Sequence, residues 1–201
     1  LFAGPNTAAE MERIIGLVGA QKYQEAKDAL DAIDGELTLT RDLKNAGVAF
    51  LSLGPLTDVP RAVGFFERAL KRGGGDSGML LAQLYSNGSY GLTPDGPRTE
   101  KYLLEAAKYS DHEAICFLAK VYSSGWVKDG AVFIAQDIPG SVKWVEKCGS
   151  ELDLLWNVSL MYYHGEQVPQ NKAHAIAIWE YMFAMYADTR GIAALFSGLE
   201  S

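Results

Sequence analysis

The sequence has few of the residues on which disulfide scaffolds, membrane spans and nucleic-acid surfaces depend. Its 201 residues include only two cysteines, too few for the disulfide framework of a small secreted domain. No apolar run approaches the roughly 18 residues that a membrane-spanning helix needs. Basic residues are also outnumbered, because 18 Lys and Arg stand against 25 Asp and Glu. The resulting charge of −7 argues against a protein that binds nucleic acid through its phosphates.

The sequence also lacks motifs of catalysis and of cofactor binding. The glycine run at residues 73–75 has neither the Lys-Ser/Thr pair nor the preceding strand of a phosphate-binding loop, so we interpret it as a turn. The histidines His112, His164 and His174 occur in separate segments without the spacing of metal ligands. Asp111 is better explained as the cap of a helix than as a metal ligand. We therefore predict no enzyme activity, no cofactor and no metal site.

A pattern of Leu-Ala-x-x-Tyr-x-x-Gly recurs along the chain. Its tyrosines are Tyr85, Tyr122 and Tyr162, which are 37 and 40 residues apart, and a weaker copy occupies residues 46–50. Each copy is followed by a segment whose apolar residues recur at i, i+3, i+4 and i+7, which is typical of a helix with one buried face. Loops rich in Gly, Pro and Asp, such as residues 93–97, separate the two segments. The repeating unit is therefore a helix hairpin of about 35 to 40 residues.

A single hairpin cannot bury its own apolar face, so neighbouring hairpins must stack. We find no convincing strand, and we predict one repeat domain over residues 6–201. Its parts are an N-terminal helix pair at 6–35, repeats at 41–74, 76–111, 112–150 and 151–187, and a terminal helix at 190–200. Residues 1–5 have the sequence Leu-Phe-Ala-Gly-Pro, which is similar to a protease site of expression vectors. We predict that they are a tag remnant and leave them out of the fold.

The repeated motif, followed by a Pro/Asp loop and by Trp-x-x-Lys-(Ala/Cys), resembles the Sel1-like repeat, a branch of the tetratricopeptide class. Residues 165–171 are similar to the family loop Gly-x-x-Val-x-x-Asp, and the resemblance covers residues 76–187 well and 41–74 moderately. Extra residues at 130–134 and Thr99, where the family usually has Ala, depart from the pattern. The resemblance implies an all-α, right-handed α-solenoid with adaptor or assembly roles. It also favours the bacterial envelope or export over the cytoplasm, which the sequence allows too.

Two cysteines belong to one predicted hairpin, Cys116 at the start of its first helix and Cys148 at the end of its second, and antiparallel packing brings those two helix ends together. A cysteine-rich branch of the Sel1-like family links its hairpins at nearly these places, which implies a disulfide. Both cysteines, however, lie one position away from that pattern when Leu118 and Trp144 are aligned, and one residue turns a helical side chain by about 100°. We therefore expect two buried or half-buried thiols rather than a disulfide.

In tetratricopeptide-type arrays the first helix of each hairpin lines the concave face, so the resemblance implies a binding groove there. With the motif as a fixed register, the groove residues are Arg41, Lys44, Val48, Met79, Gln83, Ser86, Asn87, Glu113, Cys116, Lys120, Ser123, Asp153, Trp156, Leu160, Tyr163 and His164. The last four of these share a face that their hairpin should not need for its own packing, and aromatic residues are enriched at interface hot spots. The alternative is that the predicted terminal helix covers them.

We predict a non-enzymatic protein–protein interaction module, an adaptor or scaffold, that binds a protein or peptide segment in the concave groove. The alternative is a regulatory or immunity-type inhibitor that occludes a catalytic protein, whose basic patch the negative charge would complement. Either partner is another polypeptide, and we expect neither nucleic acid nor a transmembrane segment. The oligomeric state stays open.

Overall fold

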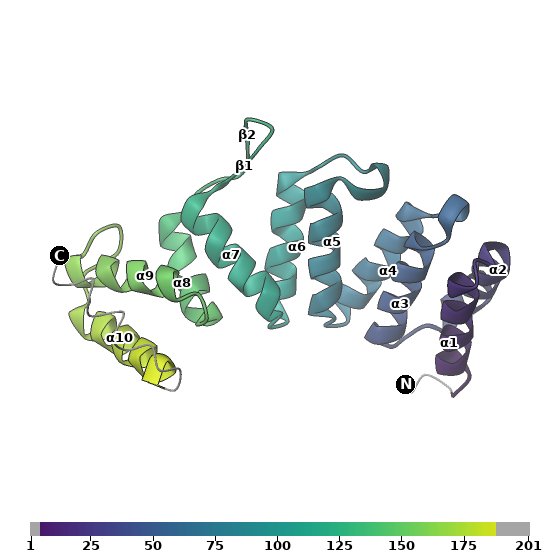
Figure 1. Cartoon of the computed structure of the whole chain (residues 1–201), viewed down its shortest axis with the longest axis horizontal. Coiled ribbons are helices and arrows are strands. Elements are labelled where there is room, and N and C mark those ends of the chain that lie inside the picture. The colour runs from purple at the N-terminus through teal and green to yellow at the C-terminus, as the bar shows by residue number, and fades with distance from the viewer. Residues whose placement is uncertain (1–4, 188–201) are drawn as a thin grey trace. The chain divides into compact units, whose positions relative to one another are not determined.

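The structure is a computed structural model that describes residues 5–187, with side chains from residue 7 to residue 185 (Figure 1). The predicted terminal helix at 190–200 and the first four residues of the predicted tag remnant lie outside the described residues. The chain divides into two compact units, one up to Ala114 and one from Ile115. We call them unit 1 and unit 2 and describe each by itself, so the single domain predicted over 6–201 stays a prediction.

Unit 1 consists of helices that lie side by side in Figure 1, from α1 in purple to α6 in teal. They are α1 (Pro5–Gly19), α2 (Tyr23–Ile33), α3 (Thr40–Leu51), α4 (Val59–Lys71), α5 (Gly75–Asn87) and α6 (Gly96–Lys108). Short 3₁₀ turns follow α2, α3 and α5, namely η1 (Asp34–Glu36), η2 (Gly54–Leu56) and η3 (Ser89–Gly91). The pairs α1/α2, α3/α4 and α5/α6 coincide with the hairpins expected at 6–35, 41–74 and 76–111. No helix within residues 5–187 is long and apolar enough to cross a membrane.

Unit 2 begins inside α7 (His112–Ser124) and contains two further helix pairs with a short insertion. Its elements after α7 are β1 (Trp126–Lys128), β2 (Ala131–Ile134), α8 (Ile138–Cys148), α9 (Leu152–His164) and α10 (Lys172–Ala187). The helices again fall within the predicted repeats at 112–150 and 151–187. Pairs of helices are therefore the main element of both units within residues 5–187.

The insertion in unit 2 corrects the expectation that the chain has no strand. β1 and β2 pair antiparallel, and Figure 1 shows them projecting from the end of α7. Asp129 and Gly130, both with positive φ, form the tight turn between them, a combination typical of two-residue β-hairpins. The ring of Trp126 packs edge-on against those of Phe117 and Phe133, which anchors one side of the hairpin. The Asp-Gly pair could have predicted this β-hairpin from the sequence, but a search for helical periodicity does not detect it.

The second helix of four hairpins begins with the same cap. Asp58, Asp95 and Asp137 precede α4, α6 and α8, and each carboxylate accepts a hydrogen bond from the backbone N–H three residues later, at 3.1, 2.8 and 3.0 Å. Asn171 caps α10 in the same way. A proline stands two residues after each of the three aspartates, where a helix needs no N–H donor. The Asp/Pro loops of the sequence are thus helix starts.

Each of these cap residues also holds its hairpin closed through the backbone. Its N–H donates to the carbonyl of the motif aromatic residue in the preceding helix. The acceptors are Phe50 at 3.2 Å, Tyr85 at 2.9 Å, Tyr122 at 2.9 Å and Tyr162 at 2.8 Å. In the last three hairpins the motif glycine ends the first helix with a left-handed φ of 68° to 76°, which a β-carbon would resist.

Small residues let the two helices of a hairpin approach closely. Ala82, Ala119 and Ser159 occupy the second position of the motif and are buried. The weaker copy has Gly47 there, where a β-carbon would lie only 2.6 Å from the ring of Phe66. The small residue at the second motif position therefore allows the two helices to pack closely, because a larger side chain there would overpack the contact.

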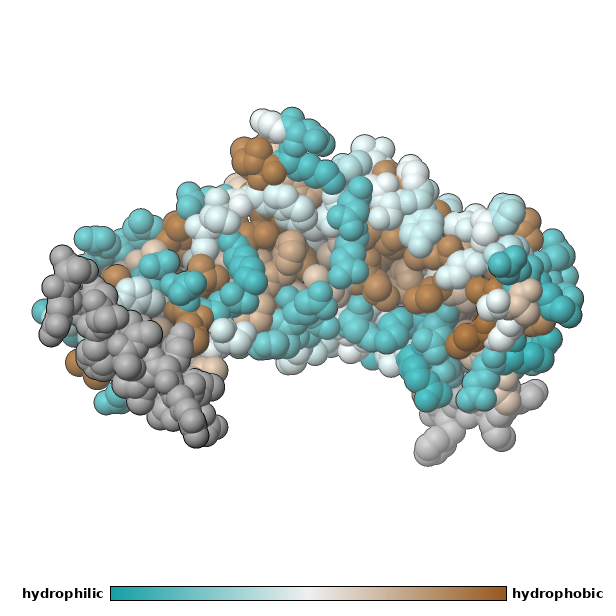
Figure 2. Space-filling view, in the orientation of Figure 1, coloured by the Kyte–Doolittle hydropathy of each residue, from teal (hydrophilic) through white to brown (hydrophobic). Residues whose placement is uncertain are grey.

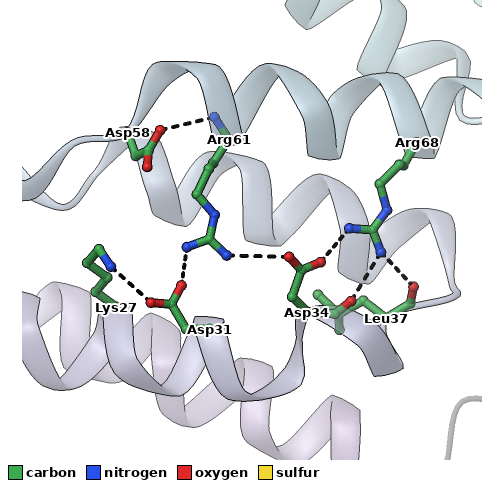
Figure 3. A network of polar contacts seen from close by, with 7 residues as sticks. All are labelled: Lys27, Asp31, Asp34, Leu37, Asp58, Arg61 and Arg68. Atoms are coloured by element: carbon green, nitrogen blue, oxygen red, sulfur yellow. Dashed lines mark hydrogen bonds and ion pairs between the residues drawn. The ribbon is translucent and has the colours of Figure 1, made fainter.

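A network of ion pairs ties α2 and η1 to α4 in unit 1 (Figure 3). Arg61 on α4 donates to the carboxylates of Asp31 and Asp34, and Asp31 also accepts from Lys27 at 2.9 Å. Arg68, two turns further along α4, donates to the carboxylate and the carbonyl of Asp34. Each aspartate is thus shared between two cations, so the first hairpin is attached to the second by a network rather than by isolated pairs.

The same arginines cover the aromatic core of the second hairpin. The rings of Phe50 on α3 and Phe65 on α4 stack with centroids 5.5 Å apart. The guanidinium of Arg61 lies 4.3 Å from the Phe50 centroid and that of Arg68 lies 4.8 Å from the Phe65 centroid. The aliphatic parts and charged ends of these arginines therefore contribute packing as well as charge.

Cys116 and Cys148 form a disulfide in unit 2, so the expectation of two thiols was wrong. The start of α7 and the end of α8 lie beside each other, and the two Cα atoms are 4.9 Å apart, within the range that a disulfide spans. The sequence offset of one residue applies to both helices. Because both cysteines are displaced by one residue from the family pattern, each on its own helix, the two side chains still face one another. Comparing each cysteine separately with the pattern could not show this.

The disulfide closes a long loop, since its cysteines are 32 residues apart in the sequence. Replacing both by serine is expected to lower the unfolding free energy of unit 2 by about 3 to 4 kcal/mol, because the unfolded chain gains the entropy of the opened loop. Urea unfolding of wild type and of Cys116→Ser/Cys148→Ser would measure this loss. Reductant should bring the wild type to the level of the double variant, and equal stability without reductant would contradict the disulfide.

The ion-pair network predicts a pH dependence of stability. Partial burial works to raise the pKa of Asp31, but the hydrogen bonds from Lys27 and Arg61 outweigh it and lower that pKa. The stabilisation is therefore complete above the ordinary aspartate pKa and is lost as the pH falls through the lowered one. We expect Asp31→Asn to cost about 1 kcal/mol at pH 7, in line with a partly exposed pair, and less at about pH 3, below the ordinary aspartate pKa. Asp28→Asn, on the same helix, is the matched control for thermal melts at both pH values.

Candidate functional site

The first helices of the hairpins in unit 1 leave a face on which three pockets lie next to one another. The first pocket, of about 180 Å³, lies between α1 and α3. Its lining is mainly apolar and consists of Ile15, Val18, Asn45, Val48, Ala49 and Ser52. Ile15 and Val48 are 50% and 44% exposed, so the pocket is open to solvent.

The second pocket, of about 280 Å³, lies between the C-terminal halves of α3 and α5. It is lined by Val48, Leu51, Ser52, Phe66, Leu80, Gln83, Leu84, Asn87, Ser89 and Tyr90. Buried Phe66 and Leu84 form its floor, while Tyr90 at its edge is 56% exposed. Apolar side chains and two carboxamides therefore face the same space.

The third pocket, of about 210 Å³, lies at the N-terminal ends of α3, α5 and α7 and is the most charged of the three. It is lined by Lys44, Asp76, Met79, Leu80, Gln83, Asp111 and Glu113. Lys44 forms an ion pair with Asp76, and Asp111 caps α7 by accepting from the backbone N–H of Ala114 at 2.9 Å. Both features place this pocket at helix starts, where anionic side chains are stabilised by the helix dipole.

The pockets join into one groove. Val48 and Ser52 line the first and second pockets, and Leu80 and Gln83 line the second and third. We call this surface the unit 1 groove. In the part of unit 1 with described side chains, Figure 2 shows hydrophobic surface over α1 and over α3 to α5 among hydrophilic side chains. The groove thus has an apolar end at α1 and an acidic end at the start of α7.

Unit 2 carries a different aromatic cluster. The Trp179 ring on α10 lies 6.0 Å from that of Trp156 and 5.4 Å from that of Tyr163, both on α9. Trp179 also donates through Nε1 to the hydroxyl of Ser159 at 2.6 Å. These residues therefore join the two helices of one hairpin.

No model of a protein family matches the sequence, and no curated protein matches it either. Several solved structures resemble the chain in fold, and two of them follow. A protective antigen of uropathogenic Escherichia coli strains, described as displaying an SLR fold, superposes with a TM-score of 0.57 over 89% of this chain at 19% identity. A Sel1 repeat protein from Oxalobacter formigenes gives 0.52 over 88% of the chain at 15% identity. The fold is that of Sel1-like repeat proteins. This chain spans 38% of the antigen and 72% of the Oxalobacter protein.

The Sel1-like fold confirms the predicted class, a solenoid of stacked helix hairpins. In unit 1, residues at the same position of the motif in successive hairpins line the same groove. Residues of α3 and α5 that are 35 apart occupy equivalent places, as Val48 and Gln83 do. The groove face comprises Leu80, Gln83 and Asn87, at i, i+3 and i+7 of α5. These three residues therefore define the face of α5 that lines the groove.

The structure places some of the residues predicted for the groove of unit 1 in that groove, and others are buried or lie outside it. Lys44, Val48, Gln83, Asn87 and Glu113 lie in the groove. Met79 also contacts the third pocket, but it is only 7% exposed, and Ser86 is buried too. Arg41 is paired with Asp42 and lines none of the three pockets.

Sequence reasoning missed Ile15, Asn45, Leu80 and Tyr90. Leu80 directly precedes the motif leucine, and Asn45 holds the same place in α3. A pass along the i, i+3, i+7 stripe through Gln83 could have found Leu80. Tyr90 lies in the loop after α5, where helical periodicity carries no information.

In unit 2 the predicted face is not free of the hairpin's own packing, so that premise was wrong for Trp156 and Tyr163, which contact Trp179. Leu160 lines a separate pocket together with Ser123. Asp153 and His164 are exposed. Their roles in binding stay predictions.

Two predicted groove residues on α7 make contacts of their own in unit 2. Lys120 pairs with Glu151 at 2.9 Å. Cys116 is in the disulfide, so neither it nor Cys148 offers a thiolate to a metal ion.

The large pKa shift of Tyr102 arises from a contact that stabilises helix packing. Burial, together with the hydrogen bond from the Tyr102 hydroxyl to Glu67 at 2.6 Å, raises the pKa of Tyr102. Its ring stacks on Tyr85 at 5.7 Å. This contact links α6 to α4 and α5, and it is a packing contact rather than a pair poised for proton transfer.

Because Trp156 is half-buried against Trp179, we expect Trp156→Ala to destabilise unit 2 by about 2 kcal/mol, less than a fully buried tryptophan would. Urea unfolding of the variant measures this, with Asn157→Ala, an exposed neighbour, as control. A variant as stable as wild type would contradict a stabilising role for the contact between Trp156 and Trp179.

Proposed function

We propose that this chain is a non-enzymatic protein–protein interaction module, an adaptor or scaffold, that binds a protein or peptide segment along the unit 1 groove. The observation that carries the proposal is the line of joined pockets with exposed apolar residues at Ile15, Val48 and Tyr90. Apolar side chains that gather at the surface, bordered by polar ones, are typical of interaction sites.

The size and shape of the pockets favour a polypeptide over a small molecule. Small-molecule sites usually enclose about 300 to 1,000 Å³ and surround most of the ligand. Each pocket of the groove is smaller, at about 180, 280 and 210 Å³. Because the pockets share lining residues, a chain with several side chains can use them in series.

The framework beneath the groove supports a preformed surface. The α3/α4 and α5/α6 hairpins are held by the cap hydrogen bonds to Phe50 and Tyr85 and by buried side chains at the close helix contact. A rigid surface loses little conformational entropy when a partner binds, so more of the contact energy appears as affinity. No contact among the described residues favours the inhibitor alternative, which stays a prediction.

The test is selection of a random peptide library, displayed on phage, against the whole chain, followed by fluorescence anisotropy with the enriched peptides. Val48→Glu should weaken their binding at least about tenfold, because it puts a carboxylate at the apolar junction of two pockets. Val127→Glu is the matched control, since Val127 is 65% exposed on β1 and lies in unit 2. Failure to enrich any peptide would count against an interaction module.

A further inference from the structure

We propose that the unit 1 groove binds a short extended peptide that combines apolar side chains with at least one Lys or Arg. The apolar side chains occupy the first and second pockets, and the basic side chain lies in the third. This inference rests on the proposed function, because it specifies the ligand chemistry of the same groove.

The length of the groove sets the length of the peptide. Its second and third pockets follow α5 from Asp76 to Asn87, which are 11 residues apart. At about 1.5 Å per helical residue this distance is about 16 Å. An extended chain covers about 3.3 Å per residue, so about five residues fill this part of the groove.

The acidic end selects a basic side chain. The third pocket has three carboxylates, those of Asp76, Asp111 and Glu113, against the single ammonium of Lys44, which leaves two negative charges. Each carboxylate lies in or beside the first turn of α5 or α7, where the helix dipole stabilises the anion. Glu113 is exposed and forms no ion pair within the described residues. A Lys or Arg side chain would offset this charge.

The apolar end selects aliphatic or aromatic side chains. Val48 separates the first and second pockets and belongs to both, so neighbouring apolar side chains of a peptide can lie on either side of it. On one side they meet exposed Ile15, and on the other exposed Tyr90 and buried Phe66, which line the second pocket. Covering these residues removes apolar surface from water, which supplies the affinity.

Carboxamides along the groove can hold the peptide backbone. Asn45 lies at the first pocket and Gln83 between the second and third. Neither side chain forms a hydrogen bond within the residues that the structure describes. Each amide offers donors and an acceptor, which match a peptide N–H and C=O irrespective of sequence. Selectivity therefore comes from the apolar and basic side chains.

The test uses two fluorescein-labelled synthetic probes, Ala-Leu-Ser-Leu-Arg-Arg and Ala-Leu-Ser-Leu-Glu-Glu, titrated with the whole chain in anisotropy measurements at low salt. The basic probe should bind at least about fivefold more tightly, since its charges attract the acidic end and those of the acidic probe are repelled. Glu113→Lys should weaken the basic probe about fivefold and tighten the acidic one by a similar factor. Glu36→Lys, an exposed change outside the groove, should leave both unchanged.

The outcomes separate this inference from the proposed function. If Val48→Glu abolishes the binding of library peptides but those peptides are acidic or uncharged, the ligand chemistry is overturned and the interaction module stands. Equal affinity for both probes, or the same response to Glu113→Lys and Glu36→Lys, also overturns the inference. If the library yields no binding peptide at all, the proposed function fails first. Preference for the basic probe together with reversal by Glu113→Lys supports the inference.

Discussion

One backbone hydrogen bond organises the hairpins from α3 to α10. The residue that caps each second helix donates its N–H to the carbonyl of the aromatic residue in the first helix, at 2.8 to 3.2 Å. This bond satisfies a carbonyl at the end of one helix and fixes the start of the next, which otherwise would each lack a partner. The cap side chain closes the same turn. The aromatic side chain beside that carbonyl is thereby held between the helices, and the pair can approach only if the neighbouring motif position is small.

The arrangement of the groove follows from this constraint. Because Phe50 and Tyr85 face their own hairpins, the residues two places before each, Val48 and Gln83, face outward on equivalent turns. Stacked hairpins then bring these outward residues together, 35 residues apart in the sequence. The helix starts gather at one end, with their capping and first-turn carboxylates, and the helix ends gather at the other. A groove with one acidic and one apolar end is therefore a consequence of parallel first helices in unit 1.

Sequence reasoning was accurate wherever a local pattern repeats. The tyrosine spacing and the Asp/Pro loops located the hairpins, since caps and apolar stripes act within a few residues. It was less accurate where one repeat departs from the others. The β-hairpin after α7 was missed because its Asp-Gly turn occurs once, and the disulfide was rejected because each cysteine was compared with the motif by itself. Trp156 was assigned to an open face although Trp179, one helix later, packs against it.

By itself the sequence determined the helix hairpins, their boundaries within a few residues and the Sel1-like class of their fold, because these depend on periodicity, capping and small residues that act locally. The tertiary structure alone decided which side chains share a surface. Ile15, Val48 and Tyr90 come from three separate segments, and only packing brings them to joined pockets. The same holds for Cys116 and Cys148, since the facing of two helices is a property of both and cannot be derived from either one.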